Sequence, residues 1–380
     1  MTSALGGYGD WARERLADPR PLSFRHERWS DADLEAWRER ARERLTASLA
    51  PPATGGTPDV TVHEAHDVEG VRVERQSWQL PYGPRTEAYF LRPADASGPL
   101  PGVLACHDHG GDKYHGKGKI VRAPGTETDY LASYREAGYD GHAWANRLAA
   151  RGYAVLVPDG FSFGSRRFDP AETVGVEGVP NPGSDAKASD IEAYNDWAGG
   201  HESTAAKACL CAGTTLPGVA LADDRVSLSV LCARPDVDAE RVGVTGHSGG
   251  GLRTAYLGAL SDRVRCAVVC CMLTTWRDFV AYGAPRHTWL VYPSLLARHL
   301  DYPDVLAMRA PAATSVLVRD DDRLFSRDAV AAASERLEAA FEKAGGREAL
   351  RVERYPGGHG FGDAMQREAF ARFEAVLRDA

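Results

Sequence analysis

Two five-residue segments of this chain match Gly-x-Ser-x-Gly, a pattern in which a serine hydroxyl can act as a nucleophile. They are residues 160–164 (Gly-Phe-Ser-Phe-Gly) and residues 246–250 (Gly-His-Ser-Gly-Gly). The pattern marks a sharp strand-to-helix turn that exposes the serine above a sheet. Chance alone supplies on the order of 0.2 matches in a chain of this length, so the flanking sequence must distinguish the two segments.

The second segment has the flanks that such a turn requires. Residues 241–245 are mostly apolar and typical of a short strand, and residues 249–260 carry an apolar helical face. Gly246 and Gly250 remove side chains at the positions where the strand and the helix come closest. The sequence therefore predicts Ser248 as the nucleophile.

The first segment lacks those flanks. Phe161 and Phe163 crowd Ser162, and no apolar helical face follows it. Pro170 ends any helix that begins after this segment. We therefore interpret Ser162 as part of a loop at the rim of a pocket.

A serine hydroxyl becomes reactive when a base removes its proton and a carboxylate orients that base. In open sheets with this turn, the order along the chain is serine, acid, histidine. Three aspartates follow a strand-like stretch at residues 315–319, and His359 lies between glycines after a second stretch at residues 350–355. This order predicts His359 as the base and Asp322 as the acid, with Asp321 as the alternative.

Acyl transfer also requires backbone N–H groups that stabilise the negatively charged oxygen of the tetrahedral intermediate. The His-Asp-His-Gly-Gly stretch at residues 107–111 directly follows a buried strand-like run. We predict the His109 N–H as one donor and the Gly249 N–H, at the start of a helix, as the other. The spacing of His107, His109 and His115 matches no zinc template, so we predict neither a metal nor a cofactor.

Alternating strand and helix patterns predict how these residues are held. Two half-exposed antiparallel strands precede a series of buried strands separated by helices, which is typical of a doubly wound, mostly parallel α/β sheet. Two irregular insertions, at about residues 160–200 and 273–310, are expected to cap the pocket. Its candidate wall residues are Phe161, Phe163, Arg166, Trp276, Trp289 and Tyr292.

The first 66 residues read as an N-terminal helical extension and linker, and residues 67–380 as the catalytic domain. Residues 30–33 form a capping-box start, and Leu34, Trp37, Ala41 and Leu45 follow at helical spacing. We expect this apolar face to dock onto the catalytic domain. The alternative is a contact between copies in a homo-oligomer.

Composition narrows the class of protein. The net charge is −8 and no basic cluster stands out, so we expect no nucleic-acid partner. The N-terminus lacks the apolar core of a signal peptide, and no apolar stretch is long enough for a membrane span. The seven cysteines show no disulfide-scaffold spacing. A cytoplasmic protein that acts on a small molecule fits these features.

The chain resembles the α/β-hydrolase superfamily, and within it the bacterial branch of dienelactone hydrolases and acetylxylan-esterase-like proteins. The resemblance covers about residues 70–380 and rests on four segments in the family's order, at residues 107–111, 246–250, 322–325 and 358–361. It implies a Ser248–His359–Asp322 triad and an oxyanion hole from the His109 and Gly249 amides. Dienelactone hydrolases use a cysteine where this chain has Ser248, and many relatives have proline where it has Arg323.

These features predict a serine hydrolase that cleaves a carboxylic ester of small to medium size through an acyl-enzyme. The same machinery would suit a peptidase or amidase, a lactone or thioester hydrolase, or an acyl-eliminating biosynthetic enzyme. The alternative of another class is a non-catalytic ligand-binding module on a hydrolase fold. Because every member of the triad is present in the sequence, we favour the enzyme.

Overall fold

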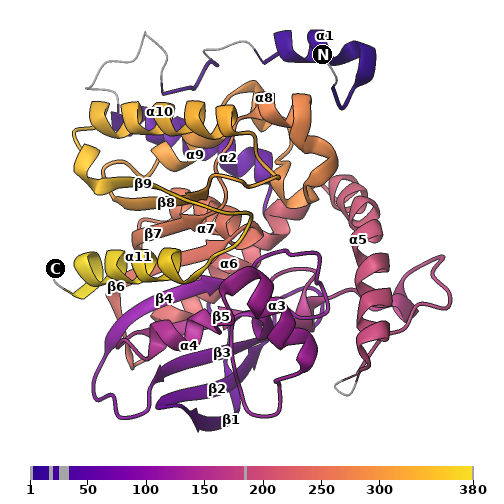
Figure 1. The fold of residues 1–380 in the computed structure, drawn as a ribbon, viewed down its shortest axis with the longest axis vertical. Helices are drawn as coiled ribbons and strands as arrows, with labels where there is room; N and C mark the ends of the chain where they lie inside the picture. Colours follow the sequence, from indigo (N-terminus) through magenta and orange to yellow (C-terminus); the bar gives the residue numbers. More distant parts are fainter. Residues whose placement is uncertain (1–2, 17–19, 25–33, 184–185, 379–380) are drawn as a thin grey trace.

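The computed structural model describes residues 3–16, 20–24, 34–183 and 186–378. Its centre is a sheet with the strand order β1-β2-β3-β5-β4-β6-β7-β8-β9, which can be followed from the bottom to the top of Figure 1. The strands are β1 Thr61–Val68, β2 Val71–Trp78, β3 Thr86–Pro93, β4 Leu100–Cys106, β5 Ala154–Pro158, β6 Val237–His247, β7 Val264–Cys270, β8 Ala313–Arg319 and β9 Leu350–Tyr355.

The pairing of neighbouring strands divides the sheet into two parts. β1, β2, β3 and β5 pair antiparallel, whereas β5, β4, β6, β7, β8 and β9 pair parallel. β4, β5 and β7 are buried on both faces, as their apolar runs predict, whereas the edge strand β9 is half-exposed. The chain passes from β4 to β5 on one side and then to β6 on the other, so the strand order reverses at β4. Open sheets bind their ligands at the carboxyl end of such a reversal.

Helices cover both faces of the sheet and bury a separate apolar core on each. One core includes residues of α2, α6, α7, α9 and α10, and the other includes residues of α3, α4 and α11 (Figure 1). The helices are α1 Gly9–Glu14, α2 Leu34–Leu49, α3 Asp129–Tyr139, α4 Trp144–Ala149, α5 Ala188–Cys211, α6 Leu216–Cys232, α7 Gly249–Leu260, α8 Trp276–Asp278, α9 Tyr302–Ala307, α10 Arg327–Lys343 and α11 Asp363–Phe373.

The predicted docking of the N-terminal helix agrees with the structure. Trp37, Ala41 and Leu45 of α2 are fully buried and belong to the same apolar core as α6 and α7. The Trp37 indole N–H donates to the Leu22 carbonyl, 2.8 Å away. The capping-box residues 30–33 lie outside the described residues. The apolar face of α2 is thus used within the chain.

Two boundaries differ from the sequence prediction. β1 begins at Thr61, before the predicted domain boundary at residue 66. The sequence did not reveal this strand because its side chains are mostly exposed and show no apolar alternation. The helical region expected at residues 203–234 is two helices, and α5 starts inside the stretch expected to be irregular. Gly213 at φ 79° lies in the break between them, and Thr215 caps α6 by accepting from the Gly218 N–H.

No single described helix is both long and apolar enough to cross a bilayer. α5 and α6 pass that test of length and composition only as a pair, and they are bent by 83° relative to each other.

Candidate active site

Ser248 lies on the strained turn that its sequence predicts. Its φ is 56° and its ψ is −118°, between the end of β6 and the start of α7. A Cβ atom on Gly250 would lie 2.1 Å from the Cys106 carbonyl oxygen, and one on Gly246 would lie 2.5 Å from the Gly250 carbonyl carbon. Only glycines fit this crossing of strand and helix. The turn therefore holds the Ser248 side chain at the carboxyl end of the sheet.

Asp322 and His359 follow β8 and β9 and meet at the same edge of the sheet. The His359 Nδ1–H donates to the Asp322 carboxylate over 2.7 Å, and the Asp322 side chain is only 5% exposed. Asp321, the alternative acid, is 62% exposed and forms an ion pair with Arg327. The geometry therefore favours Asp322 as the partner of His359.

The surroundings of Asp322 keep its carboxylate ionised. Burial raises the pKa of this carboxyl, but the hydrogen bond and charge of His359 and the Leu324 N–H lower it more, and the net pKa is below its ordinary value. An ionised carboxylate at the Nδ1 side leaves Nε2 as the unprotonated, basic atom of a neutral His359 ring. That is the tautomer a general base needs.

The His247 ring connects the Ser248 turn with His359. Its centroid lies 4.6 Å from that of the His359 ring and 5.7 Å from that of Tyr139. Burial, followed by the charge of His359, lowers the pKa of His247 to about 3, so this ring stays neutral. Among the described residues, no hydrogen bond joins the Ser248 hydroxyl to His359. In free enzymes such catalytic bonds often tighten only when the substrate binds.

The two predicted oxyanion donors are neighbours. A Cβ atom on Gly249 would lie 3.1 Å from the His109 nitrogen. Gly249 is the first residue of α7, where an N–H has no acceptor within the helix. The His109 N–H likewise has no acceptor in the described part of the chain. Two unpaired amides side by side, next to Ser248, form an arrangement that can bind a negatively charged oxygen.

Glu202 of α5 binds the loop at residues 107–113, called the oxyanion loop below after its predicted role, to the insertion at residues 273–310. Sequence reasoning missed this role. The Glu202 carboxylate accepts from His109 Nε2 at 2.8 Å and Lys113 Nζ at 2.7 Å, and also from the Thr288 hydroxyl and the Trp289 N–H. Burial raises the pKa of Glu202, but His109 and Lys113 lower it more, well below its ordinary range. A glutamate in a helical pattern gives no sequence signal for such a role.

Three predicted wall residues take other positions. The Arg166 guanidinium is buried and paired with Asp223 at 3.1 Å, so it does not face an open pocket. Trp276 is 6% exposed and its indole N–H donates to the Leu300 carbonyl. Phe163 is 3% exposed and packs against the rings of His107 and His109. The prediction of Arg166 as a wall residue is therefore corrected, because a buried carboxylate satisfies its charge.

The other three wall candidates are half-buried. Phe161 packs edge-on against Phe168, and Trp289 packs edge-on against Tyr292. The Trp289 N–H donates to Glu202, which also binds His109, so the Trp289 backbone lies close to the oxyanion loop. A role for these three aromatic side chains in the pocket wall stays a prediction.

Ser162, the serine of the first segment, is buried rather than at a pocket rim. It also has a positive φ, 68°, and is 1% exposed. Its hydroxyl accepts a hydrogen bond from Lys113 Nζ at 3.0 Å. No α-helix follows it directly, since the next helical element is a single 3-10 turn, Gly164–Arg166. Both segments therefore form tight turns, but only the Ser248 turn is followed by an α-helix.

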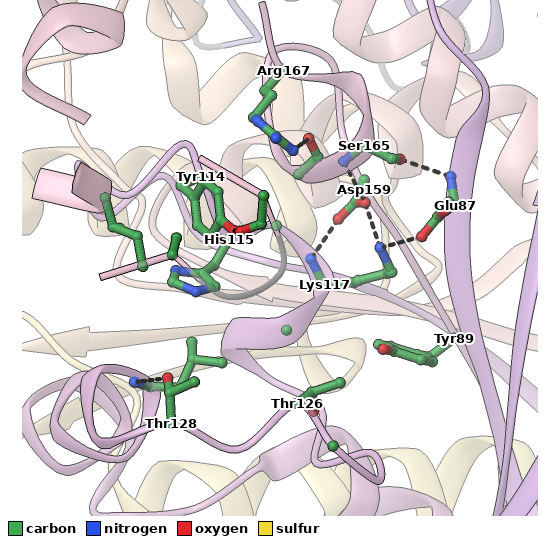
Figure 2. A pocket seen from close by; sticks show the side chains of 18 residues that line it. Glu87, Tyr89, Tyr114, His115, Lys117, Thr126, Thr128, Asp159, Ser165 and Arg167 are labelled. Carbon is green, nitrogen blue, oxygen red and sulfur yellow. Dashed lines mark hydrogen bonds and ion pairs between the residues drawn. The ribbon is translucent and has the colours of Figure 1, made fainter. Parts of the chain in front are cut away.

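A separate cavity of about 400 Å³ is lined by residues of β3, of the loop at residues 114–118 and of the turn after β5 (Figure 2). Lys117 lies at one side, with its ammonium group 2.7 Å from the Asp159 carboxylate and 3.2 Å from that of Glu87. Tyr89 and Arg167 also line the cavity, but none of the predicted catalytic residues does. Its acidic and basic groups already neutralise one another.

One group of described side chains has ligand atoms close enough to share a metal ion. The atoms belong to His247, Cys271 and His359 and lie within 4.8 Å of one another. Burial raises the pKa of the Cys271 thiol to about 12, which disfavours the thiolate that a metal needs. A metal here would also be bound by His359, the ring that Asp322 holds by a hydrogen bond. We therefore assign this group no cofactor.

The chain was compared with protein families, with curated proteins and with solved structures. No family model matches the chain. A relative from Bacillus subtilis (strain 168), "Putative hydrolase YtaP", is 28% identical over 290 residues, which cover 76% of this chain and 82% of the relative.

Among solved structures, a "putative acetyl xylan esterase" from Bacteroides fragilis superposes with a TM-score of 0.66 at 16% identity, covering 92% of this chain and 82% of that one. A glucuronoyl esterase from Solibacter usitatus superposes with a TM-score of 0.63 at 13% identity, covering 91% and 93%. The sheet, the turn at Ser248 and these neighbours agree with the predicted fold, whereas the likeness to dienelactone hydrolases stays a prediction. The chain therefore has the α/β-hydrolase fold.

Proposed function

We propose that this protein is a serine hydrolase that cleaves carboxylic esters of small to medium size. One observation carries the proposal: the hydrogen-bonded His359–Asp322 pair shares a sheet edge with the strained Ser248 turn and two unpaired amides. The hydrolase and esterase names of the relatives support ester hydrolysis as the reaction class. Fold alone would not do so, because this fold hosts many chemistries.

The reaction proceeds in two halves. Ser248 Oγ attacks the ester carbonyl carbon while His359 Nε2 takes the hydroxyl proton, and the His109 and Gly249 N–H groups bind the oxygen that becomes negative. His359 then gives its proton to the leaving alcohol, and an acyl-enzyme on Ser248 remains. Water, deprotonated by His359, attacks the acyl-enzyme, and His359 returns that proton to Ser248 Oγ as the acid is released. Asp322 stays ionised throughout and stabilises the imidazolium.

Turnover of matched esters and amides tests the reaction class. Nitrophenyl esters of increasing acyl length are compared with nitroanilides of the same acyl groups. We expect esters to be cleaved at least about 100-fold faster in kcat/KM, which corresponds to about 2.7 kcal/mol of barrier. Faster cleavage of the anilides would contradict the proposal and favour a peptidase or amidase.

The names of the neighbours indicate which natural esters to try first. The Bacteroides and Solibacter structures carry the names of esterases for acetyl xylan and glucuronoyl esters. Acetylated sugars and sugar-acid esters therefore belong in the substrate panel beside the nitrophenyl esters. Activity on either would place the substrate among carbohydrate-derived esters.

A further inference from the structure

The peptide between Asp108 and His109 carries one of the two proposed oxyanion donors. A trans peptide is planar, and its C=O and N–H groups point in opposite directions. Whatever fixes the Asp108 carbonyl therefore also fixes the direction of the His109 N–H. A backbone amide can contribute to catalysis only if it already points at the oxygen when charge develops there.

Two side chains hold the Asp108 carbonyl. Lys119 Nζ donates to it over 2.8 Å, and His107 Nδ1 donates to it over 2.9 Å. The Gly160 N–H donates to His107 Nε2 at 3.1 Å, so the proton of the neutral His107 ring is on Nδ1. The Asp108 carbonyl thus accepts two hydrogen bonds.

Lys119 also holds the next peptide. Its ammonium group donates to the His109 carbonyl over 3.0 Å, so one cation bridges two successive carbonyls. Lys119 is fully buried, and its ammonium group lies 4.9 Å from the centroid of the Phe163 ring and 5.6 Å from that of Tyr134. A buried cation with its hydrogen bonds made has few alternative positions, so both peptide planes are firmly set.

We propose that Lys119 is the positioning residue of the oxyanion hole: its ammonium group fixes the Asp108–His109 peptide so that the His109 N–H faces the reacting oxygen. The proposal rests on the proposed function. The positive charge on the carbonyl side also polarises the peptide, which makes its N–H a stronger donor. Lys119 acts through this peptide and touches neither substrate nor the Ser248 side chain.

Lys117 gives a matched control. It lies in the same short helical turn, residues Lys117–Lys119, and is itself largely buried. Its ammonium group binds the carboxylates of Asp159 and Glu87 rather than the oxyanion peptides. Lys117→Met therefore removes a buried lysine without releasing the Asp108–His109 peptide.

The experiment compares Lys119→Met, Lys119→Gln and Lys117→Met with the unchanged enzyme on a nitrophenyl ester. Each kcat is divided by the fraction of molecules that a fluorophosphonate finally labels, so unfolded protein is not counted. We expect kcat to fall about 10- to 100-fold in Lys119→Met, somewhat less than when an oxyanion donor itself is removed. Lys119→Gln, which keeps an uncharged amide donor, should fall between Lys119→Met and the unchanged enzyme.

Two readouts separate positioning from a merely structural role. KM should stay within about threefold, because the oxyanion donors act mainly in the transition state. The affinity for a boronic acid, which forms a tetrahedral adduct on the serine, should fall in proportion to kcat/KM. Lys117→Met should keep kcat within about threefold and an unchanged boronate affinity.

Folded Lys119 variants with the kcat and boronate affinity of Lys117→Met would overturn the proposal. If Lys119→Met does not fold, Lys119→Gln decides by the same criterion. The failure of the proposed function would look different, because the unchanged enzyme itself would then not be labelled on Ser248. A labelled, active enzyme whose Lys119 variants match the control overturns only the role of Lys119.

Discussion

At the scale of single residues, the partners of the side chain distinguish the two serines of the Gly-x-Ser-x-Gly segments. Ser248 and Ser162 both have a positive φ and both lie between glycines. Ser162 is buried and accepts a hydrogen bond from Lys113. Ser248 directly follows His247, whose ring centroid lies 4.6 Å from that of His359, the ring that Asp322 binds. Their local patterns are therefore alike, and their partners distinguish them.

His247 is a residue whose titration should be measurable. Its ring is buried, and its two nitrogens have no hydrogen-bond partner among the described residues. Burial and the charge of His359 lower its pKa to about 3, whereas in an unfolded chain it takes up a proton near pH 6.5. Between these values the unfolded state binds more protons, so the free energy of unfolding falls as pH falls.

Replacing His247 by phenylalanine should remove the contribution of His247 to the pH dependence of the unfolding free energy. Between pH 7.5 and 5.5 the unchanged protein should lose about 1 kcal/mol more unfolding free energy than His247→Phe. Urea unfolding at the two pH values measures this difference. The control is His66→Gln, on the exposed strand β1, which should behave like the unchanged protein. An equal loss in His247→Phe and His66→Gln would contradict the assignment.

At the scale of elements, the crossing of β4, β6 and α7 sets the positions of the nucleophile and the oxyanion loop. β4 and β6 are neighbours in the sheet, so the residues after β4 lie against the start of α7. A Cβ atom on Gly250 would lie 2.1 Å from the Cys106 carbonyl oxygen at the end of β4. The nearest atoms are all backbone atoms, so no flexible side chain can move aside to make room for an added methyl group.

Gly250→Ala should therefore push the oxyanion loop away from the Ser248 turn. We expect an unfolding free energy lower by about 1–3 kcal/mol, as for other overpacked sites, together with a reduced kcat. Gly199→Ala is the matched control, because Gly199 is an exposed helical glycine of α5 with no atom near its missing Cβ. It should instead stabilise the protein by about 0.5–1 kcal/mol. Thermal unfolding of both variants measures the contrast, and a stable, fully active Gly250→Ala would contradict the account.

Some elements and contacts could not be predicted from the sequence. β1 has polar, exposed side chains, so it lacks the apolar alternation by which strands are found. Residues 188–211 contain Gly199 and Gly200 and many polar side chains, which weaken the helical pattern of α5. Glu202 and Lys119 are ordinary charged residues in sequence, and only the folded chain brings them to the oxyanion loop.

At the scale of the whole molecule, the reversal of strand order at β4 gathers segments that are far apart in the sequence. The loop after β4 lies between the turn after β5, which holds Ser162, and the turn after β6, which holds Ser248. β8 and β9 then supply Asp322 and His359 at the same edge. The order of these segments along the chain was readable because each follows a strand-like stretch, although β9, which precedes His359, is half-exposed. The contacts of Glu202 with the insertion at residues 273–310 could not be predicted from the sequence, because they depend on packing that follows no repeated pattern.

We expect Ser248, and not Ser162, to be the nucleophile. The most direct test is labelling of the intact protein with a fluorophosphonate, followed by mass measurement and peptide mapping. We expect a single adduct on Ser248, with labelling lost in Ser248→Ala and retained in Ser162→Ala. An adduct on Ser162, or no adduct on the folded protein, would contradict the account.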